Sequence, residues 1–231
     1  DFCVKYRRHI HLPFTIWSHP KMVTPQLLSK LKAVGLTEVI MGIQSGSERV
    51  RREVFHRYES QQDVIGAVRA IRDTGVWGSF DLMLQHPFET IDDLKASYAL
   101  VKELPSPYEL QLHGLNFLPG TDIVDMAIDQ GLCTPEEMDG VMFAPMEEQF
   151  GAYWKQDASQ ESQAWYRMIY CWQFEKFRKK LVSWESDPVA HMAELDACYA
   201  QAQKIARTRY LYKKGYVVWR RMVMGLYPTK K

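Results

Sequence analysis

The sequence predicts an α/β protein in which a parallel sheet precedes a helical region. Short apolar segments rich in β-branched residues alternate with amphipathic segments that begin at helix-capping residues. The interval between the apolar segments is that of a strand–turn–helix unit, and right-handed crossovers make such strands parallel. The sequence has no alternating strand pairs joined by two-residue turns, which disfavours a β-sandwich. After residue 132 the pattern changes to helices alone.

Four strands are predicted, at residues 9–17, 38–43, 76–84 and 108–117. Pro13 lies in the first of them. Because proline cannot donate a backbone hydrogen bond, this strand is expected to lie at a sheet edge or to break early. The other three are short apolar segments bounded by glycine, proline or polar residues, as in buried parallel strands.

The helices are predicted mainly from their ends. Side-chain oxygens that can cap a first turn occur at Thr24, Ser47, Ser60 and Thr90, and Gly35 and Gly75 end two helices. Further helices are expected at 122–130, 159–184, 188–214 and 216–226. Residues 140–155 are expected to form a loop that either lines a substrate pocket or packs between the sheet and the helices.

Composition and charge indicate a soluble protein with two unlike surfaces. The 231 residues are 46% hydrophobic and 25% charged, without an apolar run near the roughly 18 residues that a membrane span needs. Residues 165–231 contain 14 Lys and Arg but 5 Asp and Glu, a net charge of +9, whereas residues 1–164 carry −8. We expect a cytoplasmic protein. Because the chain opens at Asp1 in an apolar and basic segment, we expect an excised piece of a longer protein.

The turn after the second strand is the best candidate for ligand binding. Residues 38–57 read EVIMGIQSGSERVRREVFHR, a buried strand that gives way to a charged segment. In parallel sheets, ligands bind where the carboxyl ends of strands meet helix N-termini. This favours the polar residues of the turn, which are Gln44, Ser45, Ser47 and Glu48. The structural alternative is that Gly46 makes a tight turn and Ser47 caps the helix.

Four segments taken together resemble the radical S-adenosylmethionine (SAM) enzymes. They are IQSGSERV from Ile43, DLMLQHPFET from Asp81, LPSPYELQL from Leu104 and NFLPGTDI from Asn116. The resemblance is to the later half of these enzymes, and in particular to the cobalamin-associated branch, which also looks like the methylthiotransferases. Those proteins have GIQSGS or GIESGS, then a proline turn followed by ET, then a PGT turn. The resemblance covers residues 10–132.

The resemblance implies a partial (β/α) barrel, whose four parallel strands are the third to sixth of six. The barrel part is expected at residues 1–132 and a basic, aromatic-rich helical extension at 133–231. A pocket for SAM is implied at the carboxyl ends of the strands. The residues implied on its adenine side are Leu84, Gln85, His86, Phe117 and Leu118, and those facing the ribose, amine or carboxylate are Gln44, Ser45, Glu48 and Arg57.

Several of these positions allow more than one interpretation. Arg57 suits a carboxylate, because a guanidinium binds it in bidentate geometry, but a solvated helix-surface arginine is an equal alternative. Gln44 stands where many relatives have Glu, and so keeps hydrogen bonding without the charge. His86 replaces the commoner Gly or Asn. Asp81, on an otherwise apolar strand, is expected to contact substrate together with His113; the alternative is a buried, hydrogen-bonded aspartate.

The cysteines do not match the family's cluster motif. That [4Fe-4S] cluster is held by a CxxxCxxC segment, which this sequence lacks. Cys3, Cys133, Cys171 and Cys198 are scattered, so free buried thiols are expected rather than metal ligands. The chain alone is therefore expected to be inactive and to bind no cofactor tightly. The parent protein is expected to use SAM and the cluster, with cobalamin left open, as an oxidoreductase or in methyl transfer to an unidentified small molecule.

The alternative is a non-catalytic binding or scaffold module. An open sheet edge at residues 9–17 would pair with the missing N-terminal part of the parent or with a second copy, giving a dimer. The basic helical tail has three interpretations. It can be a solvated face over the acidic sheet region, a nucleic-acid surface, or an interfacial helix at an anionic membrane. The first is preferred because it needs no partner.

Overall fold

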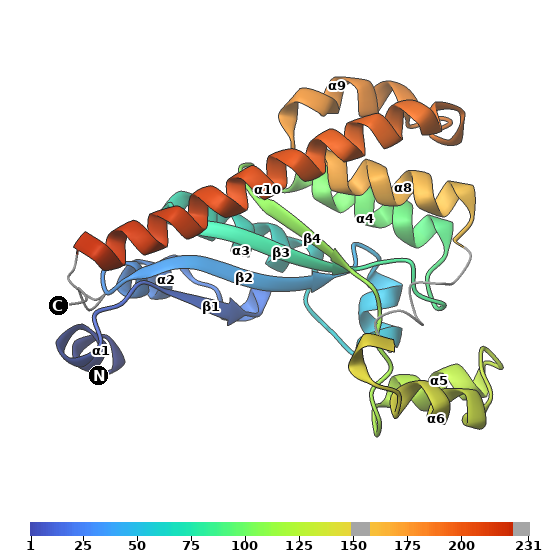
Figure 1. Cartoon of the computed structure of the whole chain (residues 1–231), viewed down its shortest axis with the longest axis horizontal. Helices are drawn as coiled ribbons and strands as arrows, with labels where there is room; N and C mark the ends of the chain where they lie inside the picture. Colours follow the sequence, from blue (N-terminus) through green and yellow to red (C-terminus); the bar gives the residue numbers. More distant parts are fainter. Residues whose placement is uncertain (149–157, 224–231) are drawn as a thin grey trace.

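Four parallel strands form one sheet in the computed structural model, which describes residues 1–148 and 158–223 (Figure 1). The strands are β1 (Phe14–Ser18), β2 (Leu36–Gln44), β3 (Trp77–Met83) and β4 (Glu109–His113). Each strand pairs with the next along the chain, so the sheet order is β1-β2-β3-β4. The α/β class and the four parallel strands expected from the sequence are confirmed.

Three helices cover one face of this sheet. They are α2 (Pro25–Lys32), α3 (Gln61–Thr74) and α4 (Ile91–Glu103), each of which connects two neighbouring strands. Burial alternates along β2, where Val39, Met41 and Ile43 are buried and the residues between them are partly exposed. The main core therefore lies between the helices and one side of the strands, and the other side is left for further elements.

The predicted starts of these helices are observed. Thr24 caps α2 by accepting the backbone N–H of Leu27, after a short 3₁₀ helix, η1 (Pro20–Met22). Ser60 and Thr90 form capping boxes with acidic residues three positions later, at the starts of α3 and α4. At its other end α3 stops at Gly75, whose φ of 70° a glycine adopts without strain.

Three predicted elements differ from the structure. The chain opens with a helix, α1 (Phe2–His9), and β1 begins only at Phe14, because Pro13 and the left-handed His11 (φ 57°) interrupt the extended backbone. Likewise β4 ends at His113 rather than at residue 117. After β2 the chain forms a turn and a π-helical segment, η2 (Val50–Val54), instead of an α-helix to residue 57.

A small helical layer lies at the carboxyl ends of the strands. It consists of α5 (Asp122–Asp129) and α6 (Pro135–Met142), which pack with Val50, Phe88 and Phe117 in a second apolar cluster. Because α6 extends to Met142, it takes up the first residues of the loop predicted at 140–155. Residues 149–155 of that loop lie outside the described residues.

The longer helices of the extension are α8 (Gln160–Trp172), α9 (Glu175–Trp184) and α10 (Met192–Val223), with a 3₁₀ turn, η3 (Val189–His191), before α10. The helix predicted at 159–184 is broken at Gln173, whose side chain accepts the backbone N–H of Leu110 on β4 at 3.1 Å. In place of the helices predicted at 188–214 and 216–226 there is one continuous helix from Met192 to Val223, and residues 224–226 lie outside the described residues. The domain boundary at residue 132 stays a prediction, since α8 and the sheet share one apolar core.

The last helix, α10, crosses the face of the sheet that α2, α3 and α4 leave uncovered (Figure 1). Lys213 Nζ donates to Glu38 Oε1 at 2.5 Å and to Glu109 Oε2 at 2.6 Å, at the beginnings of β2 and β4. The Tyr216 ring meets the Trp77 ring edge-on at 5.5 Å. These contacts cover the starts of the strands and leave their carboxyl ends to the site described next. Within residues 1–148 and 158–223, no helix is long and apolar enough to span a membrane.

Candidate cofactor and substrate site

The candidate site is the uncovered face of the sheet at the carboxyl ends of β2, β3 and β4. Strand pairing places Gly42 beside Asp81, and Met83 beside His113. Because side chains alternate along a strand, Asp81 and His113 point to the face opposite the buried Phe80 and Leu82. Two side chains that the sequence predicts as substrate contacts therefore lie together on this face.

Gly42 allows two other predicted residues to reach the same face. Gln44 ends β2 with a φ of 69°, at an irregularity in the pairing with β3, and its side chain folds back over Gly42. A Cβ atom on residue 42 would overlap Gln44 Nε2 and lie 3.2 Å from Arg57 Nη1. Only glycine at position 42 leaves room for this arrangement, so Gln44, Arg57 and Asp81 converge where β2 and β3 end.

Arg57 is already held by other groups of the protein. Its Nη2 donates to the Gly42 carbonyl at 2.8 Å, and its Nε donates to Glu59 Oε1 at 2.6 Å. Burial tends to raise the pKa of Glu59, but its own backbone N–H and the Arg57 guanidinium lower it overall, so the carboxylate is ionised. His19 Nε2 lies 3.2 Å from the other oxygen of Glu59. Arg57 is thus fixed in place, and its Nη1 has no hydrogen-bond partner among the described residues.

Asp81 and His113 form the most polar part of the open face. Asp81 Oδ1 lies 3.5 Å from His113 Nε2, and this oxygen is buried without a hydrogen bond within the described part of the chain. The interaction with Asp81 raises the pKa of His113. The pair therefore combines a carboxylate that lacks a donor with an imidazole that is half exposed, which suits a polar ligand.

Ser45 and Glu48, which were also predicted to face the cofactor, each have a partner of their own in the structure. Ser45 is fully buried, and its Oγ lies 3.3 Å from Ser97 Oγ on α4 and accepts the backbone N–H of Ser47 at 3.1 Å. Glu48 is exposed and pairs with Arg52 one helical turn later. This turn is fastened to α4 through Ser45 and Gly46, while the side chain of Gln44 reaches over Gly42 at the site.

The loop after β3 contributes mostly buried groups. Leu84 is fully buried, and its N–H donates to the His113 carbonyl at 3.0 Å. Gln85 (φ 58°) lies toward α8, where its side chain donates to Ser162 Oγ at 3.4 Å. His86 is buried beside Phe55, and burial lowers its pKa to about 4. This loop can therefore offer a ligand its backbone and its apolar groups more readily than its polar side chains.

The last two predicted residues lie on the loop after β4. Phe117 is buried against Phe88, with ring centroids 6.4 Å apart, whereas Leu118 is exposed. Both follow the end of β4 and precede α5, so they border the strand ends from the side of the small helical layer. Whether they contact an adenine stays a prediction.

Two buried acids near the site were not predicted. Glu89 accepts the N–H of Gln85 at 2.6 Å, and burial raises its pKa to about 8. Asp93 forms an ion pair with Arg49 and accepts a hydrogen bond from Ser47 Oγ at 2.5 Å. The capping box was a signal for Asp93, but no sequence pattern indicates the burial of the Glu89 carboxyl group.

The cysteines do not provide a metal site in the part of the chain that the structure describes. No group of three or more His, Cys, Asp or Glu residues there is arranged to hold a metal ion. Cys171 and Cys198 are buried, and burial raises the pKa of Cys171 to about 12, which disfavours the thiolate that a metal requires. The residues present therefore do not fit an iron–sulfur cluster.

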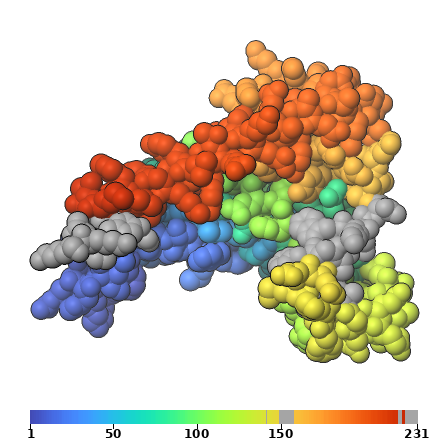
Figure 2. Space-filling model, viewed as in Figure 1, coloured from blue at the N-terminus to red at the C-terminus, as the bar shows by residue number. Residues whose placement is uncertain are grey.

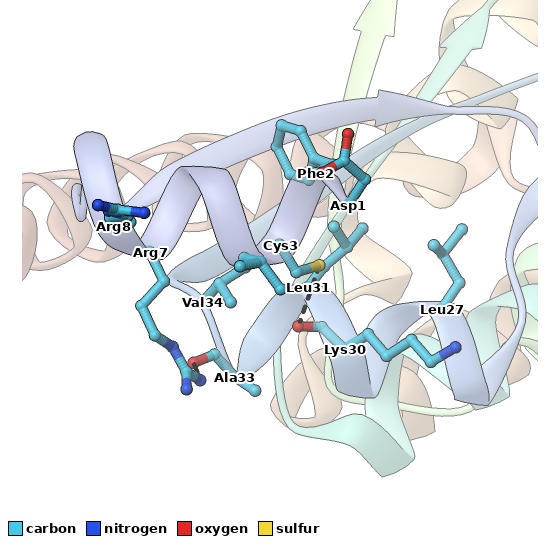
Figure 3. A pocket seen from close by; sticks show the side chains of 11 residues that line it. Asp1, Phe2, Cys3, Arg7, Arg8, Leu27, Lys30, Leu31, Ala33 and Val34 are labelled. Atoms are coloured by element: carbon cyan, nitrogen blue, oxygen red, sulfur yellow. Dashed lines mark hydrogen bonds between the residues drawn. The ribbon is translucent and has the colours of Figure 1, made fainter.

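A groove of about 750 Å³ lies elsewhere, between α1 and α2 (Figure 3). Its walls are mostly apolar, from Phe2 and Cys3 on α1 and Leu27 and Leu31 on α2. The Cys3 Sγ donates to the Lys30 carbonyl at 3.8 Å and so ties the two helices together. None of the residues predicted for the site lines this groove.

The fold and the open strand ends define a partial (β/α) barrel of the kind that binds ligands at its carboxyl face. Residues 3–101 match the family described as the radical SAM superfamily. A curated relative, tRNA-2-methylthio-N(6)-dimethylallyladenosine synthase of Sorangium cellulosum (strain So ce56), is 33% identical over 90 residues, which are 37% of this chain and 18% of the relative.

A solved structure of TM-score above 0.5 has a similar fold. The radical SAM methyltransferase TsrM from Kitasatospora setae, with cobalamin and a [4Fe-4S] cluster bound, covers 88% of this chain and 48% of its own chain, with a TM-score of 0.51 and 14% identity. Elp3 from the archaeon Methanocaldococcus infernus covers 68% of this chain and 33% of its own, with a TM-score of 0.46 and 19% identity. The chain spans less than half the length of these relatives.

Proposed function

We propose that this chain forms the later part of the SAM-binding barrel of a radical SAM enzyme. The observation that carries the proposal is the convergence of Gln44, Arg57 and Asp81 at the open carboxyl ends of β2 and β3. This convergence lies within residues 3–101, the segment that matches the superfamily. SAM has a carboxylate, an amine and two ribose hydroxyls, and these groups need donors and acceptors at fixed positions.

The proposed contacts follow from the free atoms at the site. Arg57 Nη1 donates to the cofactor carboxylate, while Glu59 holds the guanidinium in position. Gln44 offers its amide to the ribose or the amine. The adenine lies against the backbone at Leu84 and beside Leu118, the exposed residue of the loop after β4. Asp81 and His113 contact the substrate rather than the cofactor.

The cysteine ligands of the family's cluster, in this proposal, come from a part of the protein outside residues 1–231. The four cysteines of the chain lack the CxxxCxxC spacing and are not arranged around a common point within the described residues. When bound, SAM supplies the radical or the methyl group of the reaction. The chain's own residues orient the cofactor and place a carboxylate and an imidazole beside the substrate. Oxidoreductase chemistry and methyl transfer, with or without cobalamin, both remain within the proposal.

The proposed partner is a further parallel strand at the free edge of β1. Within the described residues β1 pairs only with β2, so its other edge is free. Further strands of a complete barrel would add there. The competing proposal is a binding module that uses the same edge to associate with another chain, and the exposed Trp17 favours association in both cases.

The experiment is saturation-transfer NMR of SAM with the 231-residue chain. We expect binding with a dissociation constant on the order of 1 mM, because only part of the pocket is present. Gly42→Ala disturbs the proposed cofactor contacts of Gln44 and Arg57, whereas Asp81→Asn changes only a proposed substrate contact on the neighbouring strand. The first should abolish the transfer to adenine and ribose protons, and the second should leave it unchanged. Glu48→Gln is the matched control, since Glu48 is exposed and pairs with Arg52 rather than with a residue of the proposed site.

A second measurement examines the cluster. Anaerobic iron–sulfide reconstitution followed by visible absorption is expected to give no stable cluster. Absence of SAM binding, or binding that Gly42→Ala leaves intact, would overturn the proposed cofactor site. A stable cluster that Cys→Ser substitutions remove would overturn the assignment of its ligands to another part of the protein.

A further inference from the structure

The C-terminal half of α10 exposes a row of large apolar side chains. Figure 2 shows α10 at the surface along its described length, above the sheet. Over residues 211–223 of this half, the exposed large apolar residues are Leu211, Tyr212, Val218, Trp219, Met222 and Val223. Isolated exposed apolar residues are common, but six within thirteen positions of one helix form a continuous surface.

The contacts of Lys213 fix which side of the helix faces the sheet. Lys213 is held between Glu38 and Glu109, so its side of α10 points inward. At 3.6 residues per turn, Leu211, Val218 and Met222 share a face roughly opposite Lys213. Among the described residues, Leu211 and Met222 therefore point away from the sheet, whereas Val218 borders a groove between α10 and the sheet. Turning the helix to bury Leu211 and Met222 would break both ion pairs of Lys213.

The charge around this row has one sign. Residues 197–231 contain nine Lys and Arg and no Asp or Glu. Of these, Arg207 and Lys214 are exposed on the same stretch of α10, whereas Lys213 is used by the sheet. The expectation that the basic tail serves to cover the acidic sheet region thus accounts for one lysine, and the exposed cations need another explanation.

We propose that the exposed face of α10 binds the surface of an anionic lipid bilayer. A helix that lies in the interface needs an apolar face, aromatic residues at its border and cations beside it, all of which this face has. Aliphatic side chains such as Leu211 and Met222 gain free energy by leaving water for the acyl region, but they offer no stacking surface to a nucleic-acid base. This inference is independent of the proposed SAM site, because α10 covers the opposite ends of the strands.

The test is co-sedimentation of the full 231-residue chain with sucrose-loaded vesicles. Vesicles of phosphatidylcholine alone are compared with vesicles that contain phosphatidylglycerol. We expect at least about tenfold tighter binding to the anionic vesicles, weakened by salt. Leu211→Ser/Met222→Ser and Lys214→Glu should each weaken it by about tenfold or more. The matched controls, Val182→Ser and Lys179→Glu, change exposed residues of α9 and should have no effect.

Tryptophan fluorescence gives a second readout. Binding should shift the emission to shorter wavelength, and Trp219→Phe should remove most of that shift while leaving sedimentation intact. The proposal is overturned if the chain ignores anionic vesicles while thermal melting shows it folded, or if the α9 controls weaken binding as much as the α10 variants. Two other results would also overturn it, each in a natural chain that does not bind vesicles. One is that the chain binds RNA and the double variant does not; the other is that the chain is a dimer by light scattering and the double variant is a monomer.

Discussion

Gly46 is a residue whose role is close packing rather than turn geometry. A Cβ atom at this position would lie 2.5 Å from the Ala96 carbonyl oxygen and 2.7 Å from the Ser97 nitrogen, both in the backbone of α4. Gly46 N–H also donates to Ser97 Oγ at 2.9 Å. The Gly-Ser turn after β2 is thus pressed against α4, and this contact holds Gln44 at the end of the strand.

Gly46→Ala should therefore destabilise the protein by about 3 kcal/mol, because neither backbone can move away cheaply. Gly66→Ala is the control, since nothing lies within 4 Å of a Cβ on that exposed residue of α3. It should raise the free energy of unfolding by up to about 1 kcal/mol through helix propensity. Urea denaturation measures both, and equal effects of the two substitutions would contradict the close-packing role.

Glu89 should make stability depend on pH. Burial raises its pKa to about 8 from 4.5, so the folded state favours the neutral acid. The contribution of neutral Glu89 to the free energy of unfolding is therefore complete below pH 4.5 and is lost as the pH rises through 8. The loss is up to about 1.4 kcal/mol per pH unit. Glu89→Gln keeps an acceptor for the Gln85 N–H but cannot ionise. Between pH 5 and 8 the free energy of unfolding should fall more steeply for the natural chain than for the variant, as urea denaturation can measure.

His86 affects the pH dependence of stability in the opposite direction, and it is present in both the natural chain and Glu89→Gln. Burial lowers its pKa to about 4, so its contribution is complete above pH 6.5 and is lost as the pH falls through 4. Because His86 is common to the natural chain and to Glu89→Gln, its effect cancels in their difference. Parallel pH profiles would show that Glu89 is not held neutral by burial.

At the scale of elements, one lysine fastens α10 to the sheet. Lys213 joins Glu38 and Glu109, and each carboxylate side chain is 18% exposed. Lys213→Met leaves two nearly buried carboxylates without a cation, so the free energy of unfolding should fall by about 3 kcal/mol. Urea denaturation measures this fall, and hydrogen exchange should show weaker protection in α10.

The control for Lys213 is an exposed ion pair of the same type. Lys102 pairs with Glu185 at 3.0 Å, with about a third of each side chain exposed, and Lys102→Met should cost less than about 1 kcal/mol. Adding Glu38→Gln and Glu109→Gln to Lys213→Met should restore most of the lost stability. If the triple variant is as unstable as the single one, unpaired carboxylates are not the cause of the lost stability.

At the scale of the whole molecule, the sequence predicts those structural features that depend on residues close together in the chain. The caps at Ser60 and Thr90 and the order of the strands follow from local signals and are confirmed. The break at Gln173 follows instead from a hydrogen bond to β4, 63 residues away, which no local pattern contains. Strand and helix order was therefore predictable, whereas helix ends set by distant partners were not.

The residues of the candidate site likewise fall into those that local sequence indicates and those whose position depends on distant partners. Gln44 was predicted because ligands gather at the carboxyl ends of parallel strands, a rule that needs only the strand positions, and Asp81 because it is a carboxylate on an otherwise apolar strand. Ser45 has the same residue type and the same turn, yet it is buried because Ser97 of α4 binds it. A residue can thus be assigned to the turn near a site from sequence alone. Whether its side chain faces the site or the core can be assigned only when the helix packed against the turn is known.

The free edge of β1 gives the last prediction. The N–H of Phe14 donates to Gly35 on the side of β2, so by alternation the N–H groups of Thr15 and Trp17 point outward. An outward row of unpaired donors and a tryptophan that is 77% exposed should make the chain self-associate through this edge.

Trp17→Pro removes one outward donor without touching the pairing with β2, and Trp17→Ala removes the side chain alone. Light scattering should show association that weakens roughly tenfold more for Trp17→Pro than for Trp17→Ala. Equal weakening would assign the association to the indole rather than to the strand edge, and a monomer at all concentrations would mean that the edge is already protected.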